Sequence, residues 1–178
     1  MRIIAGTYGS RKLFTLPGDN TRPSSDRLKT ALFSKIGPYF DGGTGLDVFA
    51  GSGAVGLEGL SRGLDFVTFI EKEKSAVGII KKNIQALGVT AQTNVLSGDA
   101  RVVTQKMSQQ FDFIFMDPPY AYENTLEIAQ NLEKCVKIGG IMIIETDKKH
   151  SLPDTIGSLI KTDQRDYGVA RLHTYEMR

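Results

Sequence analysis

The sequence contains no tryptophan, one cysteine and two histidines in 178 residues. A single cysteine, Cys135, excludes an internal disulfide. With only His150 and His173 beside it, there is no cluster of ligands for a structural zinc, and we expect no metal. No apolar run approaches the roughly 20 residues of a membrane-spanning helix, and the first residues lack the apolar region of a signal peptide. These absences predict a cytoplasmic protein with no membrane partner.

The net charge is small, at +2, but it is unevenly distributed along the chain. Residues 1–40 carry a net charge of +5, whereas residues 41–160 carry −4. A basic arm on a mildly acidic body suits a polyanionic partner, although an ordinary solvated surface explains the same pattern. We therefore predict two parts, a basic N-terminal extension at 1–40 and a larger domain at 41–178.

The periodicity of apolar residues predicts an α/β fold. Strands alternate with helices, which implies a parallel, doubly wound sheet. The last two predicted strands have no helix between them, so we expect them to form an antiparallel hairpin at the edge of a seven-stranded sheet. The extension reads as a short hairpin followed by a helix at 24–40. The predicted strands are 46–50, 66–70, 93–97, 111–116, 141–145, 158–166 and 170–177, and the predicted helices of the domain are 54–62, 74–87, 100–107 and 124–135.

A glycine-rich loop follows the first predicted strand of the domain. Gly51, Gly53 and Gly56 satisfy G-x-G-x-x-G between a strand and a helix, and Glu71 ends the next strand, where a carboxylate can hold a ribose. Taken alone, this arrangement is compatible with a nicotinamide dinucleotide and hence with an oxidoreductase.

Two further acids change that interpretation. Asp47 lies inside the first strand, and Asp99 follows the third. Together with Glu71 they would repel a pyrophosphate, but they match an ammonium group, a ribose diol and an adenine amine. This combination favours S-adenosylmethionine, and the short chain leaves no room for the substrate domain of a dehydrogenase.

The tetrapeptide Asp117-Pro118-Pro119-Tyr120 follows a buried predicted strand at the same edge of the sheet. Proline removes backbone donors, so the loop presents carbonyls and a carboxylate next to an aromatic ring. Such a surface can hold the two hydrogens of an exocyclic amine on a nucleobase and stack on the base. Asp117 would stabilise the positive charge that grows on nitrogen during methyl transfer.

These motifs resemble the amino-methylating class of S-adenosylmethionine-dependent methyltransferases, which have a Rossmann-like methyltransferase fold. Within that class the chain is similar to the RsmD family, which are 16S rRNA (guanine-N2)-methyltransferases that act on the small ribosomal subunit. The family-specific block is Thr21-Arg22-Pro23 with Asp26-Arg27, supported by Arg11-Lys12-Leu13 and by the glycine loop and tetrapeptide. The chain departs from the expected pattern at Ser24-Ser25 and at Lys29-Thr30, outside the residues of the chemistry.

The resemblance implies a role for each group of residues. The RNA would be 16S rRNA within an assembled or assembling subunit, bound by a monomer, with positioning phosphate contacts from the basic arm. Catalytic roles fall to Asp117, Pro118, Pro119 and Tyr120; cofactor contacts to Asp47, Phe49, Gly51, Ser52, Gly53, Glu71, Lys72, Asp99 and Ala100; and RNA contacts to Arg11, Lys12, Arg22 and Arg27.

Three other functions are compatible with parts of the sequence. A DNA adenine-N6 methyltransferase, or an enzyme for another RNA base, would present the same amine to Asp117, but such DNA enzymes usually carry an added recognition domain. An NAD-binding oxidoreductase gives the tetrapeptide no role. An RNA-binding module with a vestigial cofactor site would not need acids at 47, 71, 99 and 117.

Overall fold

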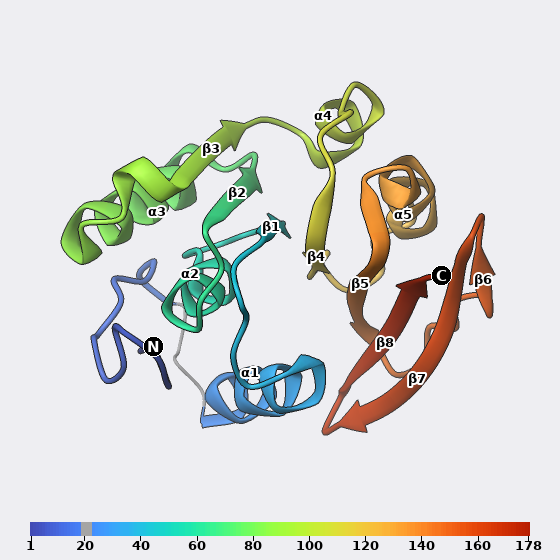
Figure 1. Ribbon diagram of the computed structural model, residues 1–178, viewed down its shortest axis with the longest axis horizontal. Coiled ribbons are helices and arrows are strands. Elements are labelled where there is room, and N and C mark those ends of the chain that lie inside the picture. The colour runs from blue at the N-terminus through green and yellow to red at the C-terminus, as the bar shows by residue number, and fades with distance from the viewer. Residues whose placement is uncertain (19–22) are drawn as a thin grey trace.

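The strands form one eight-stranded sheet in the order β3-β2-β1-β4-β5-β8-β7-β6 (Figure 1). The computed structural model describes residues 1–18 and 23–178. The first five strands run parallel, and the last three are antiparallel additions at one edge. The strands are β1 (Thr44–Val48), β2 (Phe66–Glu71), β3 (Thr93–Ser97), β4 (Phe111–Met116), β5 (Val136–Asp147), β6 (Thr155–Ile156), β7 (Leu159–Tyr167) and β8 (Ala170–Met177).

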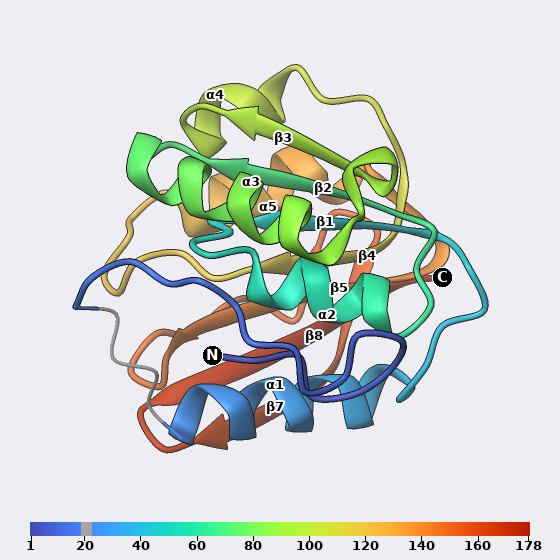
Figure 2. The same ribbon diagram turned by 90° about the vertical axis from the view of Figure 1, so that its left-hand side faces the viewer.

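Helices cover both faces of this sheet (Figures 1 and 2). One face carries α1, α2 and α3, and the other carries α4 and α5. Side chains along β4 point alternately to the two faces and so contribute to both hydrophobic cores. Phe113 and Phe115 belong to the cluster under α1–α3, and Ile114 and Met116 belong to the cluster under α4 and α5. The helices are α1 (Pro23–Ile36), α2 (Ala54–Ser61), α3 (Lys74–Leu87), α4 (Ala100–Gln105) and α5 (Thr125–Glu133), with a 3₁₀ turn at Thr90–Gln92.

The predicted α/β fold with a C-terminal antiparallel hairpin is confirmed. Several element ends lie one or two residues from their predicted positions, and three differences are larger. The predicted count of seven strands is one short, because the two-residue β6 pairs with β7. The strand predicted at 141–145 begins earlier, at Val136. The strand continues through the two glycines before residue 141 because its pairing with β4 contains a bulge between Phe111 and Phe113. The helix predicted to reach residue 40 ends at Ile36, where Gly37 adopts φ +109°.

The N-terminal segment pairs with itself and packs on the sheet domain. Arg2 and Lys12 form an antiparallel bridge, flanked by a 2.9 Å bond from Ile3 N to Arg11 O. Ile3 and Leu13 are buried in the same cluster as the side chains of α1, α2 and α3. The predicted hairpin is therefore present as a short pair, and it shares a core with the larger domain. Of the residues described, no helix is long and apolar enough to span a membrane.

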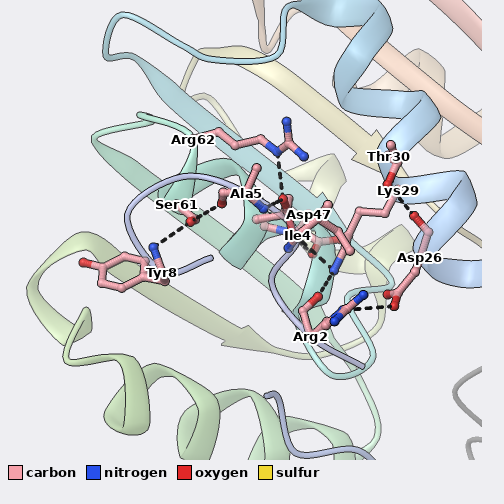
Figure 3. Close-up of polar contacts among 12 residues, drawn as sticks. Arg2, Ile4, Ala5, Tyr8, Asp26, Lys29, Thr30, Asp47, Ser61 and Arg62 are labelled. Carbon is pink, nitrogen blue, oxygen red and sulfur yellow. Dashed lines mark hydrogen bonds and ion pairs between the residues drawn. The ribbon is translucent and has the colours of Figure 1, made fainter. Parts of the chain in front are cut away.

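One buried carboxylate, that of Glu58, holds this segment in place, and Figure 3 labels Ile4, Ala5, Lys29 and Arg62, which contact it. Glu58, in α2, is fully buried, and its oxygens accept bonds from Ile4 N at 2.8 Å and Ala5 N at 3.1 Å. The same oxygens lie 3.3 Å from Lys29 Nζ and 2.7 Å from Arg62 Nε. Burial lowers the pKa of Lys29, and the Glu58 charge opposes that shift. A single side chain thus joins the N-terminal segment, α1 and the end of α2.

Replacing Glu58 tests this anchor. Glu58→Gln keeps the shape but leaves two buried cations with a neutral partner, so we expect the free energy of unfolding in urea to fall by about 3–5 kcal/mol. Glu127→Gln is the matched control, because its partner Arg101 lies at 2.8 Å in a pair that is 36–51% exposed, and it should cost less than about 1 kcal/mol. Equal losses from the two variants would contradict the anchoring role.

Candidate active site

Four acidic side chains meet at the carboxyl edge of the parallel strands. Asp47 lies in β1, Glu71 ends β2, Asp117 follows β4, and Glu145 lies near the end of β5. Met116 pairs with Ile144, so Asp117 and Glu145 are neighbours one residue further along. Side-chain alternation places Asp47, Asp117 and Glu145 on the face that carries α1, α2 and α3. The sheet therefore presents a row of carboxylates, of which Glu145 was not predicted.

Backbone N–H groups of the glycine loop and of α2 donate hydrogen bonds to two carboxylates of this row. Gly51 N donates to Glu71 Oε2 at 2.8 Å, and Gly56 N donates to Asp47 Oδ2 at 2.9 Å. A Cβ on Gly56 would lie 2.4 Å from Phe69 Cε1, so α2 packs too closely on β2 for any side chain there. Gly51 differs, since it has φ +57° and a Cβ there would meet nothing within 4 Å. The loop is thus closed toward the sheet and open at Gly51, where a ligand can approach.

Burial raises the pKa of three acids in the row. The pKa of Asp47, which is 3% exposed, rises to about 8; desolvation is the main cause, the charges of Asp117 and Glu71 add to it, and the Gly56 N–H opposes it. The pKa of Glu145 also rises to about 8, through burial and then the Asp117 charge. Asp117 is open to solvent at the edge, yet the surrounding protein displaces enough water to raise its pKa to about 6. Such a site stabilises a bound cation.

The predicted cofactor residues fit S-adenosylmethionine. Both oxygens of Glu71 accept backbone bonds, from Gly51 N and, at 2.9 Å, from Glu73 N, which fixes the carboxylate while lone pairs remain for ribose hydroxyls. Asp99 caps α4 through a 2.9 Å bond from Arg101 N to one oxygen. The remaining residues follow the same strand ends: Phe49 and Ser52 in the glycine loop, Gly53 at the N-cap of α2, Lys72 after Glu71, and Ala100 at the start of α4.

The Asp117-Pro118-Pro119-Tyr120 loop is fixed to its neighbours. Asp117 N donates to Val48 O at 3.2 Å, which ties the loop to the end of β1. Tyr120 is 56% exposed, and the next residue, Ala121, adopts φ +61°. A left-handed conformation in a residue other than glycine costs about 1–2 kcal/mol, and such strain clusters at functional sites. The loop therefore holds its acceptors and its aromatic ring in one arrangement beside the acidic row.

Two of the predicted RNA-binding residues, Arg11 and Lys12, lie apart from this row. Arg11 and Lys12 are exposed on the N-terminal segment, whose turn docks on Ser61 through a 3.0 Å bond from Tyr8 N to Ser61 Oγ. Ser61 ends α2, whereas the glycine loop lies at the start of that helix. Arg27 is exposed in α1, and Arg22 lies outside the described residues. The structure does not bring Arg11 and Lys12 to Asp117, and their RNA contacts stay a prediction.

Sequence reasoning missed Asn83, which connects the N-terminal segment to the cofactor loop. Its side chain is fully buried in α3, and Nδ2 donates to Phe14 O at 3.0 Å and to Ser52 O at 2.9 Å. Oδ1 accepts from Phe14 N at 2.7 Å. The sequence signal that could have identified Asn83 was an asparagine on the apolar face of a predicted helix, between Ile80 and Leu87. The signal that could have identified Glu145 was an acid at the end of a buried strand.

A Rossmann-like sheet with a glycine loop, a row of acids at its carboxyl edge and Asp-Pro-Pro-Tyr after β4 defines the class of S-adenosylmethionine-dependent methyltransferases. The family described as "Conserved hypothetical protein 95" matches residues 1–176. The chain belongs to this family, and the predicted relationship to the RsmD methyltransferases is confirmed.

Individual relatives agree with this assignment. "Putative rRNA methyltransferase YlbH" of Bacillus subtilis is 35% identical over 183 residues that cover 100% of both chains. "Ribosomal RNA small subunit methyltransferase D" of Haemophilus influenzae is 36% identical and covers 85% of this chain and 81% of its own length. The structure of "Putative methyltransferase yhhF" from Escherichia coli superposes with a TM-score of 0.86 at 27% identity, covering 100% of this chain and 98% of that one. A putative SAM-dependent methyltransferase from Streptococcus mutans, at 12% identity and a TM-score of 0.69 over 85% of this chain and 48% of that one, shows the fold alone.

The raised pKa of Asp47 predicts a pH-dependent stability. In the unfolded chain this carboxyl has a pKa of about 4, whereas in the folded protein the pKa is about 8. Between these values the folded state holds a proton that the unfolded state has released, so stability falls as pH rises, by at most about 1.4 kcal/mol per pH unit for one group. Asp47→Asn removes this contribution, and its stability relative to wild type should therefore increase with pH.

Urea unfolding from about pH 5 to about pH 8 measures this difference. Wild type should keep losing stability across the range, and the variant should lose less, with Glu145 responsible for part of the remaining slope. Asp41→Asn, at an exposed position, is the control and should run parallel to wild type. Parallel curves for Asp47→Asn and wild type would show that Asp47 is ionised in the folded protein.

Proposed function

We propose that this protein transfers a methyl group from S-adenosylmethionine to the N2 amine of a guanine in 16S rRNA of the small ribosomal subunit. The observation that carries the proposal is the position of Asp117-Pro118-Pro119-Tyr120 beside an acidic row that suits a cationic cofactor. The relatives named rRNA methyltransferases support the substrate class. We further propose that the protein acts as a monomer in the cytoplasm, on an assembled or assembling subunit.

S-adenosylmethionine supplies a methyl group on a positively charged sulfur. Glu71 would hold its ribose, Asp99 the adenine amine, and Asp47 the ammonium group at the end of β1. Burial and the neighbouring charges raise the pKa of Asp47, so a bound cation would lower that pKa again, and the ionised carboxylate would in turn hold the ammonium group. A site that raises the pKa of its acids in this way suits a positively charged ligand.

Asp117 and the Pro118 carbonyl would accept the two hydrogens of the guanine amine and direct its lone pair toward the methyl group. The lone pair would form the new N–C bond as the C–S bond breaks and its electrons return to sulfur. The nitrogen would become positively charged, and Asp117 would stabilise this charge more in the transition state than in the ground state. The methylated nitrogen would then release one proton, and the Asp117 carboxylate or water would accept it. Tyr120 would stack on the base and keep it in line.

The acceptor can be identified from the labelled product. We would incubate the protein with methyl-labelled S-adenosylmethionine and unmethylated small ribosomal subunits, naked 16S rRNA or duplex DNA, and digest each to nucleosides. The expected product is N2-methylguanosine from the subunits. Labelled N6-methyladenine from DNA would support the proposed methyl-transfer mechanism but show that the substrate is DNA adenine. Absence of label in all three reactions, with cofactor binding intact, would contradict the proposed activity.

Asp117→Ala separates catalysis from cofactor binding. Loss of the acceptor that faces the developing positive charge should lower kcat by about 10²–10³. Cofactor binding, measured by calorimetry, should persist, because Asp47, Glu71 and Asp99 hold the cofactor in this proposal. Asp41→Ala, which removes an exposed acid at the opposite end of β1, should match wild type in both measurements. Equal turnover by Asp117→Ala and wild type would exclude the proposed role.

A further inference from the structure

A cavity of about 320 Å³ lies beside the Asp117–Tyr120 loop, between residues 118–126 and residues 146–152. Its lining includes Thr146 of β5, and Thr146 and Glu145 point to opposite faces of the sheet. The four acids of the active site are not among the lining residues. The cavity thus shares Pro118, Pro119 and Tyr120 with the catalytic loop but lies on the α5 side, away from the acidic row.

The walls of this cavity suit a flat aromatic ligand. Tyr120 and Tyr122 stand on one side, and the Tyr122 ring is supported edge-on by Phe49 at 5.3 Å between centroids. Leu126 and Leu152 supply apolar surface, and Ser151 lies exposed at the rim. Nucleobases in single-stranded RNA are bound by stacking on such aromatic and apolar side chains.

The turn after β5 forms one rim of the cavity and carries positive charge. Lys148 and Lys149 are exposed, and His150 next to them lines the cavity. The turn is held rigid by bonds from Lys148 N to Val169 O at 3.1 Å, from Lys149 N to Asp147 Oδ1 at 2.8 Å, and from His150 N to Asp147 O at 2.9 Å. The two ammonium groups are therefore presented from a fixed backbone.

These lysines differ from the arginines near the same edge of the sheet. Arg101, Arg165 and Arg171 each form an ion pair, with Glu127, Asp163 and Asp166 respectively. Within residues 1–18 and 23–178, neither Lys148 nor Lys149 forms one. The acidic row repels phosphate, so a nucleic acid strand that delivers its base to Asp117 must leave on a side where positive charge is available.

We propose that this cavity binds the nucleotide adjacent to the methylated one. Its base would lie against Tyr122 and against the face of the Tyr120 ring opposite the methylated guanine, and its phosphate would lie on Lys148 and Lys149. The inference rests on the proposed function, since it assumes an RNA strand with one base turned into the active site. It adds a second RNA-binding surface to the N-terminal segment, on the other side of the catalytic loop. It would also allow the protein to recognise the nucleotide next to the methylated guanine.

Two variants test the phosphate and base contacts separately. Lys148→Ala/Lys149→Ala should weaken binding to unmethylated small ribosomal subunits. It should also reduce the slope of log affinity against log salt by about 0.7, the value for one phosphate of a single strand, between about 50 and 200 mM KCl. Ser151→Trp should fill the cavity and raise KM about tenfold or more without changing that slope, since base stacking contributes about 1–3 kcal/mol. Both variants should keep wild-type kcat at saturating subunits and wild-type cofactor affinity.

Lys106→Ala/Lys134→Ala is the matched control, because these exposed lysines follow α4 and α5 at the opposite edge of the sheet. It should leave the salt dependence unchanged, and Ser151→Ala should leave KM unchanged. A wild-type salt slope in the Lys148/Lys149 variant, or a wild-type KM in Ser151→Trp with thermal unfolding confirming its fold, would overturn the inference. Failure of the wild-type protein to methylate any RNA would instead overturn the proposed function.

Discussion

Repulsion among like charges at the carboxyl edge of the sheet is the constraint on which the site depends. Burial raises the pKa of Asp47 and Glu145 to about 8, and the charge of Asp117 adds to both shifts. In the described part of the chain, no residue forms an ion pair with Asp47, Glu71, Asp117 or Glu145. The two packed cores offset the cost of holding these acids together. A cationic ligand would relieve this repulsion. The same clustered negative charges therefore destabilise the empty site and favour binding of the cofactor.

Two buried polar side chains hold the N-terminal segment on the domain, and one of them, Asn83, also reaches the carboxyl edge. Glu58 binds the backbone of Ile4 and Ala5, and Asn83 joins Phe14 to the carbonyl of Ser52 in the glycine loop. Both lie inside helices that pack on the same face of the sheet, so neither contact can move without disturbing the core. The basic segment is therefore positioned relative to the cofactor loop by the interior of the domain, and the surface charges on it occupy defined places.

The alternation of strands and helices could be predicted from the sequence because each element carries its own periodicity. The helix Lys74–Leu87 and the strands Thr93–Ser97 and Phe111–Met116 have the predicted bounds, and the glycine loop and tetrapeptide lie at one edge as parallel pairing requires. Glu145 could not be recognised as a neighbour of Asp117 until β5 was placed beside β4. The cavity was equally hidden, because its walls come from segments about 25 residues apart that meet only in the folded sheet.

The distribution of aromatic residues has an optical consequence. With no tryptophan in the chain, the ultraviolet emission of the folded protein comes from six tyrosines. Tyr120 and Tyr122 line the cavity beside the catalytic loop, while Tyr175 of β8 is fully buried in the core, with its hydroxyl bonded to Pro153 O at 2.6 Å. Occupation of the cavity would alter the first two fluorophores and leave the third as an internal reference, so the unlabelled protein carries its own spectroscopic sensor.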